Sequence, residues 1–118
     1  ASVLSSREFG ARYTFHSTEP LPMAPVKRLV VDVLKPHAPD LLEFTEQLAA
    51  VESVDGVTTS LIELDKEVQN VKLTFEGEAL VFPDIEDRVD ALGGTIHSVD
   101  QVACGAYVVE DRHTLQDP

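Results

Sequence analysis

Two segments with alternating apolar residues constrain the fold most strongly: VKRLVVDVLK at 26–35 and NVKLTFEG at 70–77. Apolar residues at every second position are typical of a strand that buries one face. If the two strands are antiparallel neighbours, one register pairs apolar residues with each other and also pairs opposite charges. Each such charge pair contributes about 0.2–1 kcal/mol. The predicted pairs are Leu29–Phe75, Val31–Leu73, Arg28–Glu76 and Asp32–Lys72.

Two amphipathic segments predict the helices that cover this sheet. In the first, apolar residues recur at helical spacing through Val51, and Asp40 or the residue before it can cap the helix. In the second, Pro83 fits the first turn, and the glycine pair at 93–94 ends the helix. The side chains expected to face the sheet are Leu41, Phe44, Leu48, Val51, Ile85, Val89 and Leu92.

The order of these elements along the chain indicates the fold class. Further strands are expected at 57–64 and 95–103, and 106–111 is a weaker candidate for a short final strand. The resulting β-α-β-β-α-β order is that of the ferredoxin-like α/β (α+β) sandwich. Its antiparallel sheet has the strand order 4-1-3-2, and two helices lie on one face.

Length and composition indicate one domain. The 118 residues suffice for a single core, expected at 26–110 between an N-terminal extension or linker at 1–25 and a C-terminal tail at 111–118. The single cysteine, Cys104, excludes an internal disulfide and suits a reducing compartment. No apolar run is long enough to cross a bilayer. These features predict a soluble cytoplasmic protein.

The charge of the chain restricts its partners. Asp and Glu number 21 and Lys and Arg number 9, which gives a net charge of −12. Such a surface repels nucleic-acid phosphates and anionic lipids, so neither nucleic acid nor membrane is an expected partner. The acidic residues are scattered along the sequence rather than clustered. This favours a solvated surface of the halophilic kind over a dedicated cation-binding patch.

The predicted topology brings polar residues from distant segments to one edge of the sheet. The first strand ends there, the second strand ends there, and the fourth strand begins there. A transition-metal site needs imidazole and carboxylate ligands, whereas Ca²⁺ or Mg²⁺ prefers carboxylates. None of the spacings matches a common metal motif. Structural roles explain the residues as well: a turn or cap for His37, a hydrogen-bonded strand end for His97, a charge pair with Lys72 for Asp32, and the hairpin for Glu63 and Asp65. The candidate ligand-binding residues are Asp32, Lys35, His37, Glu63, Asp65 and His97, of which His37, Asp65 and His97 are candidate metal ligands.

Three segments of the chain, KRLVVDVLKPHAPDLLEF, VDGVTTSLIELDKEVQNVKLTFEG and LGGTIHSVDQVACG, resemble domain-of-unknown-function family 211, an archaeal conserved region. The resemblance covers 26 to about 110 and implies a ferredoxin-like fold, ring-like homo-oligomers and no established enzymatic activity. It also implies that Ser98 and Asp100 belong with the polar residues named above, so Asp100 joins the candidate ligand-binding set. Together with the acidic composition, it suggests a haloarchaeal source.

Two functional hypotheses follow from these observations. The preferred one is a non-enzymatic homo-oligomeric module that binds a small ligand or a cation, with a divalent cation as one candidate, at the edge near His37 and His97. The alternative is a small hydrolase or lyase that uses His37 or His97 as a general base beside Asp32 or Asp65. No catalytic residue is assigned.

The uncovered face of the predicted sheet bears on the quaternary state. It is expected to expose five apolar side chains, and the two edge strands lack partners within one subunit. We therefore expect a homo-oligomer, ring-like and with more than two subunits. The five side chains are Val30, Leu34, Ile62, Leu64 and Val99.

Overall fold

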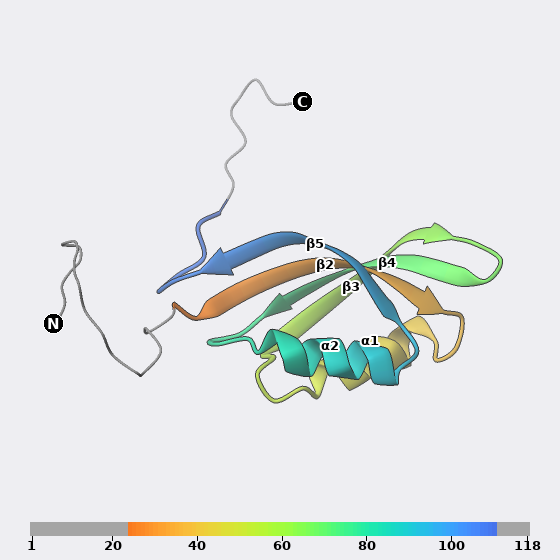
Figure 1. The fold of residues 1–118 in the computed structure, drawn as a ribbon, viewed down its shortest axis with the longest axis horizontal. Coiled ribbons are helices and arrows are strands. Elements are labelled where there is room, and N and C mark those ends of the chain that lie inside the picture. The colour runs from red at the N-terminus through yellow and green to blue at the C-terminus, as the bar shows by residue number, and fades with distance from the viewer. Residues whose placement is uncertain (1–23, 111–118) are drawn as a thin grey trace, which may run out of the picture.

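The computed structural model describes residues 24–110, so the predicted tail and nearly all of the predicted extension lie outside the described residues. The four strands form one antiparallel sheet in the order β3-β4-β2-β5, and both helices lie on one of its faces (Figure 1). This is the predicted strand order counted from the opposite edge, so the predicted fold class is confirmed. The elements are β2 (Val26–Pro36), α1 (Leu41–Ala49), β3 (Gly56–Leu64), β4 (Val68–Glu76), α2 (Phe82–Ala91) and β5 (Thr95–Cys104).

The central pair of strands, β2 and β4, has the predicted register throughout. Leu29 lies opposite Phe75, Val31 lies opposite Leu73, and both predicted charge pairs are register partners. The apolar members face the helices and have at most 4% of their surface exposed. Alternation of apolar residues therefore determined both the pairing and the buried face. The predicted pairs Arg28–Glu76 and Asp32–Lys72 lie on the opposite, open face.

Each helix begins near the position that the sequence predicts, although only α1 has a side-chain cap. Asp40 caps α1, since its Oδ1 accepts the backbone N–H of Glu43 at 2.8 Å. The helix ends at Ala49, before the predicted Val51, although Val51 is buried as expected. In α2, Pro83 lies in the first turn, and Gly93 ends the helix at a φ of 86° that favours glycine.

The two edge strands depart from simple alternation because β3 contains one bulge and β5 contains two, at His97 and Asp100. In β3, Ile62 is an extra residue, and beyond it Leu64 lies opposite Gln69 on the helix side. In β5, Val99 lies opposite Val31, again on the helix side. The predictions that Leu64 and Val99 face the open side are therefore wrong, because a bulge reverses the facing of the residues that follow it, up to the next bulge.

The predicted apolar patch on the open face is also smaller than expected. Val30 and Leu34 do face that side, but Val30 is only 8% exposed and Leu34 is partly buried. Their register partners on β4 are Thr74 and Asn70. The open face is therefore largely polar along its centre.

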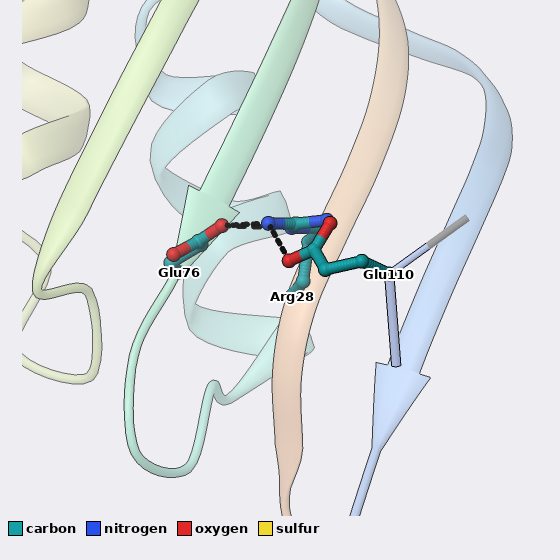
Figure 2. A network of polar contacts seen from close by, with 3 residues as sticks. All are labelled: Arg28, Glu76 and Glu110. Carbon is teal, nitrogen blue, oxygen red and sulfur yellow. Dashed lines mark hydrogen bonds and ion pairs between the residues drawn. The ribbon is translucent and has the colours of Figure 1, made fainter. Parts of the chain in front are cut away.

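The chain turns back after β5 instead of forming the weakly predicted final strand. Residues 106–110 contain no strand, and Gly105 turns with a φ of 118°. The carboxylate of Glu110 then accepts two hydrogen bonds of 3.1 Å from the Arg28 guanidinium, which also donates to Glu76 at 2.7 Å (Figure 2). Arg28 thus joins β4 to the segment that follows β5. No helix in residues 24–110 has the length and apolar character needed to cross a membrane.

Candidate functional site

Several of the predicted site residues lie where β2 ends, around the loop at 37–40 and the hairpin between β3 and β4. We call this region the strand-end corner. Lys35 is its centre, and its side chain points toward the helices with no exposed surface. The ammonium donates to the carbonyl oxygen of Pro36 at 2.7 Å and to Oε1 of Gln69 at 3.0 Å, with a longer contact of 3.5 Å to the carbonyl oxygen of His37. All three N–H groups of the ammonium thus have an acceptor.

The charge on Lys35 is held without a carboxylate in contact. Burial lowers the pKa of the Lys35 ammonium, while the nearby Asp40 carboxylate acts in the opposite direction. The ring of Phe44 lies beneath the ammonium, with its centroid 5.6 Å from Nζ. Neutral oxygens and an aromatic face therefore solvate a buried cation. Lys35 is an internal residue of the corner rather than an exposed contact for a ligand.

His37 connects the two loops of the corner. Its Nε2 lies 2.9 Å from the backbone carbonyl oxygen of Asp65, a geometry in which Nε2–H donates. The Asp65 carboxylate instead accepts the backbone N–H of Lys66. The structure thus brings His37 and Asp65 together, but through the main chain of Asp65 and not through its carboxylate.

The remaining predicted residues lie away from this group. Asp32 is the register partner of Ser98, whose hydroxyl donates to Asp100 at 2.7 Å. His97 is the extra residue of a bulge in β5. It lies beside Asp32 and Val33 of β2. From this position, the end of β2 lies roughly 10 Å farther along the strand, so His97 is separated from the strand-end corner. Glu63 is exposed and lies opposite Asn70.

The predicted metal ligands do not form one site within this chain. Across residues 24–110, no group of three or more His, Cys, Asp or Glu side chains is placed to hold a metal ion. His37 and Asp65 lie in the strand-end corner, whereas His97 lies on β5. Binding of a small ligand at this edge stays a prediction.

Sequence reasoning missed Gln69, which supplies an acceptor to the buried ammonium. The sequence suggests a polar hairpin residue there. Its position in the sequence could have revealed this role, because Gln69 is two residues before Val71 and therefore shares the inward face of β4. The same alternation places Lys35 on the inward face with Val33.

A second feature lies at the other end of the sheet, on the helix side. A hollow of about 250 Å³ opens between β5, the start of β2 and the segment that leads into α2, and we call it the apolar cleft. Val99 and Val102 from β5 form one wall and are 47% and 52% exposed. Among residues 24–110, no charged side chain lines the cleft. Its other lining residues are Val26, Leu29, Leu80 and Phe82.

The fold and these two features define a small ferredoxin-like α+β protein with a closed polar corner and an open apolar cleft. A family model described as an uncharacterized ArCR, domain-of-unknown-function family 211, matches residues 27–118. The chain is 42% identical over 92 residues to the uncharacterized protein MJ0319 of Methanocaldococcus jannaschii, which is 78% of this chain and 95% of that protein. The chain therefore belongs to domain-of-unknown-function family 211, as the resemblance indicated.

Proposed function

We propose that this protein is a non-enzymatic module that assembles head to tail into a ring-like homo-oligomer of more than two subunits. The observation that supports this most directly is the pair of unpartnered sheet edges. Within residues 24–110, neither β3 nor β5 has a second partner strand. Both carry large exposed apolar side chains, which a monomer normally avoids at a free edge. They are Leu61, Ile62 and Leu64 on β3 and Val99 and Val102 on β5.

The strand directions permit the two edges to pair with each other. Neighbouring strands alternate in direction across the whole sheet, so β3 and β5 point in opposite directions. If a second copy continues the sheet with its helices on the same side, its β3 lies antiparallel to β5 of the first copy. Such a contact is heterologous and closes into a ring when the rotation between copies permits.

The side chains at this joint are chemically matched. Leu61 is the register partner of Val71, so it lies on the helix side of its sheet. The apolar cleft lies on the same side beside β5. Continuing the sheet therefore places Leu61 of one copy on the same face of the joint as Val99 and Val102 of the next. Burial of apolar surface contributes about 25 cal/mol per Å², which favours this arrangement.

Light scattering of the full chain in high salt tests the proposal. We expect a particle several times the chain mass of 12.9 kDa. Val102→Asp should reduce it to a single chain with a native circular dichroism spectrum, since the side chain is 52% exposed and outside the core. The matched control is Leu42→Asp, because Leu42 is 69% exposed but lies on α1. A monomeric unmodified chain, or a Val102→Asp variant that stays assembled, would contradict the proposal.

The other parts of the functional hypothesis remain predictions. A ligand site formed by the edge residues is compatible with assembly, which places residues of neighbouring copies side by side. In residues 24–110, no structural observation favours a hydrolase or lyase over assembly, and Nε2 of His37 is already hydrogen-bonded to a backbone carbonyl oxygen.

A further inference from the structure

The strand-end corner contains a small set of oxygen atoms that converge on one point inside the protein. They are the carbonyl oxygens of Pro36 and His37 and Oε1 of Gln69, at 2.7, 3.5 and 3.0 Å from Nζ of Lys35. They come from the end of β2, the loop that follows it and the start of β4. We call these three atoms the oxygen cradle. Convergent neutral oxygens are the ligands that replace the hydration shell of a small monovalent cation.

The cradle is closed by an aromatic ring and lacks a negative charge of its own. Phe44 of α1 presents its ring to the ammonium at 5.6 Å. In the described part of the chain, Lys35 takes part in no salt bridge. A buried ammonium without an ion-pair partner is costly unless its hydrogen bonds are all made. The local structure is therefore arranged to accept one positive charge.

We propose that the corner holds a binding site for a primary ammonium group or a small monovalent cation, which Lys35 occupies as a cation tethered to the chain. Lys35 is then a positioning residue: it joins β2, the 37–40 loop and β4 through one charge. This inference is independent of the proposed assembly, because the cradle lies in the interior and not at a sheet edge.

Chemical rescue tests this inference. Lys35→Ala removes the side chain beyond Cβ and leaves the cradle facing an empty space of the same shape. The n-propylammonium ion has the same atoms as the deleted part. We expect Lys35→Ala to melt at a lower temperature than the unmodified chain, and n-propylammonium chloride to restore most of the loss. Tetramethylammonium chloride at equal concentration, which screens charge equally but donates no hydrogen bond, should restore little.

Two control variants separate a cation site from a cavity. Val33→Ala also opens a fully buried position on the same face of β2, but apolar atoms surround it. The melting temperature of Val33→Ala should change equally in the two salts. Lys35→Met fills the space without a charge, so the two salts should again have equal effects.

Three results would overturn the inference. One is an equal response of Lys35→Ala to the two salts. Another is a preference for n-propylammonium that Val33→Ala shows to the same extent. The third is a Lys35→Ala variant that stays unfolded in both salts while Lys35→Met folds, which would show that Lys35 only fills space.

Discussion

The central strands and the edge strands of this sheet follow different rules. The register of β2 with β4 is regular over its whole length, whereas both β3 and β5 shift register within their pairings. A central strand is paired on both sides, so an extra residue would disrupt two ladders at once. An edge strand has one free side and can accommodate a bulge at lower cost. The alternation of apolar residues therefore predicts which face of the sheet a side chain occupies reliably in the central strands and poorly in the edge strands.

The same difference separates the stable part of the molecule from the part that is free to interact. The helix-facing residues of β2 and β4 are almost completely buried, while β3 and β5 carry most of the exposed large apolar side chains in the described strands. Substitutions in the centre should therefore change folding stability, and substitutions at the edges should change association. Substitutions in the core, at two glycines and at two charge pairs test this division.

The largest effect is expected from the core of the central pair. Leu73→Ala should lower the free energy of unfolding by about 2–4 kcal/mol, because it removes fully buried methyl groups. Urea denaturation in the Val102→Asp background measures this without a contribution from subunit contacts. The matched control at the edge is Leu64→Ala, whose side chain is 63% exposed and should change the value by less than about 1 kcal/mol. Similar losses of unfolding free energy for Leu73→Ala and Leu64→Ala would contradict the proposed division between a stabilising centre and interacting edges.

A smaller effect on the free energy of unfolding is expected when a methyl group is added to a glycine, and it should differ between a central and an edge strand. A Cβ at Gly77, just after β4, would meet the backbone carbonyl oxygen of Ser53, whereas a Cβ at Gly56 in β3 would meet open space. Gly77→Ala should cost about 1–3 kcal/mol, as overpacking does. Gly56→Ala should be nearly neutral in the same urea titration. A neutral Gly77→Ala would show that the turn after β4 adjusts more freely than the packing indicates.

The smallest effects are expected from the charge pairs on the open face. Arg28 and Glu76 form an ion pair of 2.6 Å with side chains 20% and 52% exposed, so their coupling should be about 0.2–1 kcal/mol and should weaken with salt. Asp32 and Lys72 share the same register but form no ion pair in the described residues. A double-mutant cycle on each pair measures both couplings. A larger coupling for the second pair would contradict the geometry.

The sequence was sufficient for the fold, because its apolar alternation and charge pairs agree on one register. It was less informative about the site. Proximity to the end of a strand suggested a ligand-binding role for Lys35, whereas its alternation with Val33 places its side chain inside the protein. His37 and Asp65 do meet, yet through a backbone carbonyl oxygen, which side-chain chemistry does not reveal. His97 was displaced by a bulge, a feature that has no simple signal in alternation.

The most direct test of the account is a mixing experiment with one edge blocked in each chain. Ile62→Asp blocks β3, and Val102→Asp blocks β5; the two side chains are 59% and 52% exposed. Each variant alone should be monomeric, because every head-to-tail joint uses both edges. An equimolar mixture retains one intact edge of each kind, so light scattering should report a particle of twice the 12.9 kDa chain mass and nothing larger. A mixture that stays monomeric, or a single variant that still assembles, would contradict assembly of β3 against β5.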